Sequence, residues 1–186
     1  MRPTGSGESA LLLLDVVRTL VNQRISYAVI GAIAASVHGA VRASMDADVV
    51  LSLAVQEALG LESVFKEAGF RTELTRGDFD DPIPAMLRLS DEYGNRVDLL
   101  IGLKGMEPAA FSRAIEVSFQ GDTLQFIGRE DFIAMKVFAG GPMDLIDAKR
   151  ALAAGGSLDA QLLRRLARQY GRSAAATLEQ LLPSQA

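Results

Sequence analysis

The sequence predicts an α/β fold, a small mixed sheet flanked by helices, with a C-terminal helical extension. Short apolar, strand-like runs alternate with helix-like segments between residues 27 and 127, whereas residues 129–182 carry only helical patterns. The chain has 186 residues, of which 49% are hydrophobic and 23% charged, and this is sufficient for a globular core. We therefore expect an α/β core over residues 1–128 and a helical region over 129–186 packed on it.

The first elements follow from apolar spacing and from glycine positions. Residues 1–8 are expected to form a disordered tail. The apolar run that starts at Leu11 is broken by Asp15 and Arg18, so it predicts an amphipathic helix over 8–23 and neither a signal peptide nor a membrane span. The elements expected next are a strand at 27–30, a helix at 33–38, a strand at 46–53 and a helix at 54–68.

Turn residues divide the remainder of the chain. The predicted order is a strand at 70–75, a loop at 76–84, a hairpin of 85–89 and 96–103, a short helix at 107–114 and a second hairpin at 115–127. Glycine and proline then separate four predicted helices, at 130–139, 143–154, 158–170 and 173–182.

Composition excludes several classes of function. The chain has no cysteine, so it has no disulfide framework and no thiolate metal site, which fits a cytoplasmic protein. A net charge of -4 argues against binding to extended duplex nucleic acid, which needs a broad cationic surface. A late basic run is interpreted as a solvated helix face: Lys149, Arg150, Arg164, Arg165, Arg168 and Arg172. We expect no membrane partner.

Three acidic residues in strand-like runs carry the chemical prediction. Asp46 and Asp48 are spaced i, i+2, so their side chains share one face of a strand. Asp98 lies in a second run, Arg96–Ile101, which can form a neighbouring strand. Three adjacent carboxylates repel one another and need a cation. Oxygen ligands favour Mg²⁺, with Mn²⁺ as an alternative.

Asp98 has otherwise apolar neighbours, and an unpaired acid in such surroundings would be costly. This favours a metal-bound role, and the alternative is an ion pair with Arg96 or Arg88. Upstream, Gly31 and Ala32 form a turn into a helix, and such a turn can hold phosphate. A divalent cation beside a phosphate site indicates nucleotide chemistry.

The segment from Gly31 to Asp48 resembles the signature of the DNA polymerase β-like nucleotidyltransferase superfamily. That signature has a hydrophobic residue and Gly, then Gly or Ser, a spacer and Asp-x-Asp. The small members, minimal nucleotidyltransferases and abortive-infection toxin types, are most similar. Their pattern matches His38-Gly39, the run Arg42-x-Ser44-x-Asp46-x-Asp48, and a later helical run with Lys136 and Asp144. The resemblance covers about residues 25–150.

This resemblance implies a nucleotidyltransferase fold and a Mg²⁺-dependent transferase of the EC 2.7.7 kind. It implies that Asp46, Asp48 and Asp98 are catalytic residues and metal ligands. The implied nucleotide-binding residues are Gly31, Ala32, Arg42, Ser44, Lys136 and Asp144. The reaction would move a nucleoside monophosphate from a nucleoside triphosphate to a hydroxyl of a protein, an RNA 3′ end or a small molecule. A toxin–antitoxin role would add an antitoxin partner.

Other interpretations stay open. Ala32 stands where the family has Gly or Ser and offers no hydroxyl, which favours a catalytically weak or inactive nucleotide-binding module. A third interpretation is a structural interaction protein. Arg42 and Ser44 could serve the loop alone, and Lys136 could be a surface lysine. His38 and Asp147 are better explained by helix-dipole stabilisation, whereas Asp144 is the stronger functional candidate of the acidic pair.

Overall fold

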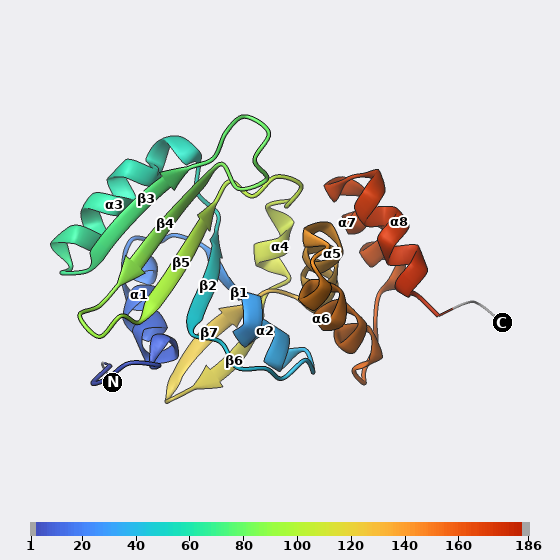
Figure 1. The fold of residues 1–186 in the computed structure, drawn as a ribbon, viewed down its shortest axis with the longest axis horizontal. Helices are drawn as coiled ribbons and strands as arrows, with labels where there is room; N and C mark the ends of the chain where they lie inside the picture. Colours follow the sequence, from blue (N-terminus) through green and yellow to red (C-terminus); the bar gives the residue numbers. More distant parts are fainter. Residues whose placement is uncertain (1–2, 184–186) are drawn as a thin grey trace.

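The computed structural model describes residues 3–183, so the predicted features at residues 1–2 and 184–186 lie outside it. A seven-stranded mixed sheet has the order β3-β4-β5-β2-β1-β7-β6 (Figure 1). The strands are β1 Tyr27–Ile30, β2 Asp46–Leu51, β3 Arg71–Arg76, β4 Ala85–Ser90, β5 Arg96–Ile101, β6 Ile115–Phe119 and β7 Asp122–Phe126. Strand β2 is parallel to β5 and antiparallel to β1, and β1 is parallel to β7.

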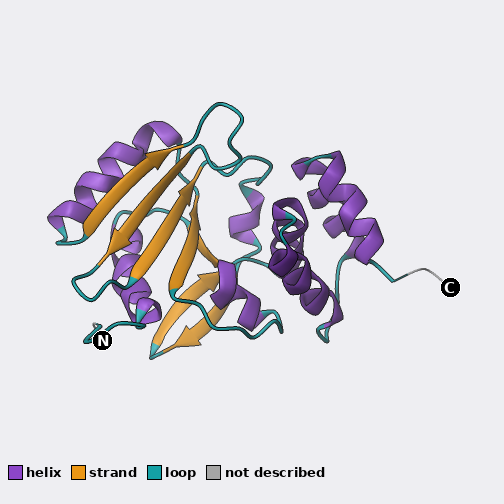
Figure 2. Ribbon diagram, in the orientation of Figure 1, coloured by secondary structure: helices purple, strands orange, loops and turns teal. Residues whose placement is uncertain are grey.

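Helices flank the sheet and continue past it (Figure 2). They are α1 Ser9–Asn22, α2 Gly31–Val37, α3 Ala58–Glu67, α4 Ala109–Ser112, α5 Arg129–Ala139, α6 Pro142–Ala153, α7 Ala160–Tyr170 and α8 Arg172–Leu181. Helix α1 contacts β2 and β5, and α3 contacts β3 and β4, so both lie on the same side of the sheet. Helix α5 packs against α6, α7 and α8. The predicted α/β fold with C-terminal helices is confirmed, whereas the division into two domains stays a prediction.

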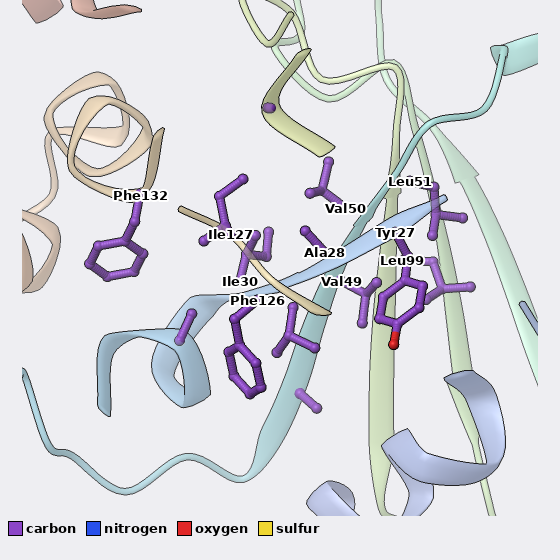
Figure 3. Close-up of a cluster of buried hydrophobic side chains, with 14 of the residues drawn as sticks. Tyr27, Ala28, Ile30, Val49, Val50, Leu51, Leu99, Phe126, Ile127 and Phe132 are labelled. Atoms are coloured by element: carbon purple, nitrogen blue, oxygen red, sulfur yellow. The ribbon is translucent and has the colours of Figure 1, made fainter. Parts of the chain in front are cut away.

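The core forms where the sheet meets these helices. Every residue of β1 is buried, as expected for a short apolar strand with neighbours on both sides. Figure 3 shows labelled core side chains from β1, β2 and β5, around the end of β7 and from α5: Tyr27, Ala28, Ile30, Val49, Val50, Leu51, Leu99, Phe126, Ile127 and Phe132. Burying one such large apolar side chain stabilises the fold by roughly 1.5–3 kcal/mol.

On β4 and β5 the burial pattern separates the two faces of the sheet. Leu87, Leu89, Val97 and Leu99 are fully buried on the face covered by α1 and α3. Arg88 alternates with the two leucines of β4 and is partly exposed on the opposite face. No described helix crosses in front of β3, β4 and β5 in the view of Figure 1. Polar side chains can therefore gather on this uncovered face.

Several element boundaries differ from the predictions. The second helix begins at Gly31 because a positive φ of 65° turns the chain directly from β1 into α2. The predicted helix at 54–68 starts with a 3-10 turn at Val55–Glu57. Residues 4–8 were expected to be disordered, but the backbone of Gly5 and Glu8 hydrogen-bonds the Asn95 side chain. That prediction is wrong for this part of the tail.

An ion-pair network joins the C-terminal helices to the segment before α4. Glu107 accepts hydrogen bonds from Arg165 of α7 at 2.7 and 2.9 Å and forms an ion pair with Arg113 at 2.8 Å. Arg113 also donates two hydrogen bonds, of 2.8 and 2.7 Å, to the buried Asp131 of α5. These contacts, led by Arg165, lower the pKa of Glu107 from 4.5 to about 2.

Within residues 3–183, every helix is too short or too polar to span a bilayer.

Glu107→Gln is expected to lower stability at pH 7 by roughly 1–2 kcal/mol, because it removes a partly screened charge from this network. Since the folded pKa is depressed, the contribution of Glu107 is present above pH 4.5 and is lost as the pH falls toward about 2. Thermal unfolding at several pH values measures this, with the exposed Glu92→Gln as the matched control. If the stability lost in Glu107→Gln stayed constant down to pH 2, the charge of Glu107 would not be its source.

Candidate active site

The parallel pairing of β2 with β5 brings the three predicted carboxylates to one face of the sheet. Asp48 lies directly opposite Asp98, and Asp46 lies opposite Arg96. The intervening Ala47 is fully buried on the other face, so the alternation predicted from the i, i+2 spacing is present. The strand order thus joins acids that are fifty residues apart in the sequence.

Two of these acids are held by arginines. Arg88 of β4 donates from Nε to Asp98 Oδ1 at 2.9 Å and from Nη2 to Asp98 Oδ2 at 3.1 Å. Arg96 donates from Nε to Asp46 Oδ1 at 3.0 Å, in a more exposed position. The argument that Asp98 would be unpaired in apolar surroundings is therefore wrong, because Arg88 on the neighbouring strand compensates its charge.

Asp48 is in a different situation. Among residues 3–183, no hydrogen bond or ion pair engages its carboxylate, and burial together with the charges of Asp98 and Asp46 raises its pKa. Lys136 and Arg42 act in the opposite direction and lower this pKa, so both cations lie within electrostatic range of Asp48. A partly buried carboxylate beside two like charges is a site that a cation would stabilise.

The lack of a side chain at Gly31 leaves space for the Asp48 carboxylate. A Cβ atom at position 31 would lie 2.0 Å from Asp48 Oδ2 and 2.8 Å from its Cγ. Ile30 is the register partner of Asp48, so the turn into α2 passes directly beside the carboxylate. Ala32, the next residue, is buried. The turn at Gly31 and Ala32 therefore lies at the site, whereas its predicted contact with phosphate stays a prediction.

A second cluster faces this site from α5 and α6. Lys136 Nζ lies 2.7 Å from Asp144 Oδ1 and 3.1 Å from Asp147 Oδ2, and Arg42 Nε lies 3.3 Å from the same Asp147 oxygen. Lys136 is only 9% exposed, so the alternative of a surface lysine is wrong. The structure thus brings together Arg42, Lys136 and Asp144, which the sequence assigned to nucleotide binding.

Asp147 was not predicted as a site residue. It is fully buried, and its Oδ1 has no hydrogen-bond partner within residues 3–183. The helix-dipole explanation is wrong for Asp147, since its carboxylate lies between two cations rather than at an exposed helix start. Asp147 and Asp144 are spaced i, i+3 and so lie on one side of α6. This spacing was the sequence feature that could have identified Asp147 as a site residue.

The remaining predicted residues have local roles in the structure. Ser44 Oγ donates a 2.7 Å hydrogen bond to the Asp46 backbone carbonyl and so closes the turn into β2. His38 is buried, its Nε2 lies 2.8 Å from the Ile127 carbonyl, and its ring packs on Phe132 at 5.0 Å. Burial lowers the pKa of His38, so it is neutral at pH 7 and does not act as a helix-end cation.

The donor chemistry fits a hard divalent cation, because the three candidate ligands are carboxylates and Asp48 has no counter-charge in direct contact. However, no group of three acidic or histidine side chains within residues 3–183 already converges as a ligand set. The arginine pairs of Asp46 and Asp98 account for this, since their carboxylates are directed toward Arg96 and Arg88.

Comparison with solved structures identifies the fold. The antibiotic-resistance factor ANT(2'')-Ia in solution is 14% identical, with a TM-score of 0.60 and coverage of 91% of this chain and 94% of that chain. A nucleotidyltransferase-like protein from Paracoccidioides brasiliensis is 15% identical, with a TM-score of 0.57 and coverage of 95% and 89%. The lincosamide adenylyltransferase LnuA with bound lincomycin is 14% identical, with a TM-score of 0.50 and coverage of 80% and 98%.

The predicted nucleotidyltransferase fold is thus confirmed. No protein-family model matches the chain, and no curated protein matches it. At 14–15% identity the likeness concerns the fold, and activity has to be argued from the site.

Proposed function

We propose that this chain transfers a nucleoside monophosphate from a nucleoside triphosphate to a hydroxyl acceptor. The acceptor oxygen forms a bond to the α-phosphorus, the bond from that phosphorus to its bridging oxygen breaks, and pyrophosphate leaves. The observation that carries the proposal is the position of Asp48, beside Asp98 on the adjacent parallel strand and within electrostatic range of Lys136 and Arg42. One surface thus offers carboxylates for a cation and cations for phosphate.

Asp46, Asp48 and Asp98 would hold Mg²⁺ or Mn²⁺. The metal, when bound, would neutralise phosphate charge and make the acceptor hydroxyl easier to deprotonate. The chain itself supplies the orientation, because β2 and β5 fix the spacing of Asp48 and Asp98, and Gly31 leaves space for the Asp48 carboxylate.

Lys136 is the proposed phosphate ligand. A lysine ammonium has three donors, of which one hydrogen-bonds Asp144, while Asp147 is an ion-pair partner at 3.1 Å. One N–H remains for a phosphate oxygen, and the two acids limit the movement of the side chain. Arg42 lies against Asp147 and would supply a second positive charge, while Ser44 holds the loop that leads into Asp46.

The fold neighbours favour a small-molecule acceptor. ANT(2'')-Ia has been seen with adenylyl-2''-tobramycin, and LnuA is an adenylyltransferase of lincosamide antibiotics. A hydroxyl on a protein or an RNA 3′ end is the other proposal, and it rests on the sequence resemblance to toxin-type members alone. The same is true of an antitoxin partner.

The test is incubation of the protein with each of the four labelled ribonucleoside triphosphates, Mg²⁺ and a cell extract, followed by separation of protein, RNA and small molecules. Tobramycin and lincomycin serve as defined acceptors in parallel. Label that moves to one fraction identifies the acceptor class, and absence of transfer with all four nucleotides contradicts the proposal.

A second candidate function is nucleotide binding without turnover. Two observations favour it: Ala32 offers no hydroxyl, and arginines neutralise Asp46 and Asp98. Isothermal titration with nucleoside triphosphates in the presence and absence of Mg²⁺ separates the two functions. A binding module would take up nucleotide and form no pyrophosphate.

Lys136→Ala is expected to weaken the use of nucleoside triphosphate about 10- to 100-fold, the value of one charge-assisted contact to phosphate. Lys136→Arg should restore only part of this, since a planar guanidinium replaces a compact charge. Steady-state kinetics at varied nucleotide concentration measure both, and metal affinity should persist because Lys136 is not a proposed ligand.

Lys149→Ala is the matched control, because Lys149 is exposed on α6 near the same acids in sequence. Thermal unfolding is needed beside the kinetics, since loss of Lys136 also leaves the buried Asp147 with a single cation. If Lys136→Ala and Lys149→Ala had equal kinetics, the assignment of Lys136 as a phosphate ligand would be wrong.

A further inference from the structure

The uncovered face of the sheet carries a row of charged side chains at the level of the candidate active site. Glu73 of β3 lies opposite Arg88 of β4, Arg88 lies opposite Asp98 of β5, and Asp98 lies opposite Asp48 of β2. The charges along this row are negative, positive, negative and negative. Only the last neighbouring pair, Asp98 and Asp48, is repulsive, and both of its members are proposed metal ligands.

The contact of Arg88 with Asp98 differs from an ordinary surface ion pair. Its two hydrogen bonds, of 2.9 and 3.1 Å, occupy both carboxylate oxygens, and Asp98 is only 9% exposed. By contrast, Arg96 makes one contact with Asp46, and their side chains are 44% and 35% exposed. Two-point guanidinium–carboxylate contacts fix orientation as well as charge.

We propose that Arg88 is the internal counter-cation of the carboxylate site and the positioning residue of Asp98. It offsets the charge of Asp98 beside Asp48 when no metal is bound, and it holds both oxygens of Asp98 at the β2–β5 junction. A bound divalent cation then takes over the charge compensation while Arg88 keeps the orientation. This inference rests on the proposed function for its catalytic consequence, whereas its electrostatic consequence is independent of turnover.

The electrostatic argument gives the direction of two effects. Without the positive charge at position 88, Asp98 and Asp48 would lie side by side with no cation in direct contact, which destabilises the metal-free protein. The same loss raises the affinity for a divalent cation, because the cation no longer competes with a guanidinium for Asp98. The orientation of Asp98 becomes looser at the same time, so the rate of transfer falls.

The first experiment measures thermal unfolding with and without Mn²⁺ for the wild-type chain, Arg88→Gln and Arg76→Gln. Arg76 is exposed at the far end of β3, so its variant removes the same charge away from the site. The rise in Tm caused by Mn²⁺ should be larger in Arg88→Gln than in wild type by about 3–6 °C, the equivalent of about tenfold tighter binding. Arg76→Gln should match wild type.

The second experiment separates kcat from KM. Arg88→Gln should lower kcat about 10- to 100-fold through misplacement of Asp98. The KM for nucleotide should stay within about twofold of wild type, since the ion pairs of Arg88 are with Asp98 and Glu73. Arg88→Lys should keep the charge and lose the two-point contact. The rise in Tm that Mn²⁺ causes in Arg88→Lys should therefore match that of wild type. Its kcat should fall between those of wild type and Arg88→Gln.

Each result decides a separate statement. Equal Mn²⁺ responses of wild type and Arg88→Gln, including no response in either at millimolar Mn²⁺, overturn the counter-cation role. A kcat of Arg88→Gln equal to that of Arg76→Gln overturns the positioning role. If wild type transfers no nucleotide but Arg88→Gln gains the larger Mn²⁺ response, the proposed function fails and the counter-cation role stands. Should Arg88→Gln not fold, Arg88→Lys still tests the positioning role.

Discussion

Asp48→Asn is expected to reduce nucleotidyl transfer by about 10³-fold or more and to raise the thermal stability of the protein at neutral pH. The activity falls because a neutral amide replaces the central carboxylate of the proposed metal site, and metal assistance supplies several kcal/mol of transition-state stabilisation. The stability rises because the amide removes a partly buried charge that lies beside Asp98 and Asp46. Transfer assays and thermal unfolding of the same samples measure the two effects.

The gain in stability depends on pH in a defined direction. Burial and the two neighbouring acids raise the pKa of Asp48 above its ordinary value of 3.8. An acid with a raised folded pKa destabilises the fold as the pH increases from the unfolded pKa through the folded one. The Tm advantage of Asp48→Asn should therefore be absent below about pH 3.8 and should grow as the pH rises through the raised folded pKa.

Asp80→Asn is the matched control, since Asp80 lies exposed in the loop between β3 and β4 and its variant removes the same charge. It should leave transfer and the pH dependence of Tm unchanged. If Asp48→Asn kept the activity of this control, Asp48 would not be a metal ligand, and the proposed function would lose its main observation.

The fold could be predicted from the sequence wherever local patterns decide the structure. The Asp46–Leu51 strand is an example, because alternation alone assigned Asp46 and Asp48 to one face and Ala47 to the other. The predicted adjacency of Asp98 is likewise correct. The start of α2 was missed because its position depends on the positive φ of Gly31, and a pattern of apolar spacing does not contain backbone dihedrals.

The ion pairs of the site could not be predicted in the same way. Asp98 had two candidate arginines in the sequence, and only the antiparallel register of β4 with β5 shows that Arg88 is the partner. Asp147 and Arg42 are separated by 105 residues and meet because α6 packs against α5 beside the sheet. Partner choice over such separations depends on tertiary packing, so the sequence supplied the residue types but not the pairs.

Gly31→Ala is the second substitution with a large expected effect, and it should lower transfer by about 10²-fold or more. The added Cβ would lie 2.0 Å from Asp48 Oδ2, so the carboxylate or the turn must move. A displacement of a catalytic group by about 1 Å can lower the rate about 10²-fold. The backbone adds strain, since a φ of 65° costs a residue with a Cβ roughly 1–2 kcal/mol. Gly31→Val should act more strongly in both respects.

Gly69→Ala separates strain from displacement, because Gly69 has a φ of 89° and a methyl group added there would meet no atom within 4 Å. Both alanine variants should lose thermal stability, whereas only Gly31→Ala should lose transfer. Nucleotide affinity measured without metal tests whether Gly31 also borders phosphate, since a methyl group that touches only Asp48 would leave that affinity unchanged. If Gly31→Ala transferred nucleotide at the wild-type rate, the Asp48 carboxylate would tolerate displacement. That result would contradict its role as a metal ligand, which requires a fixed position.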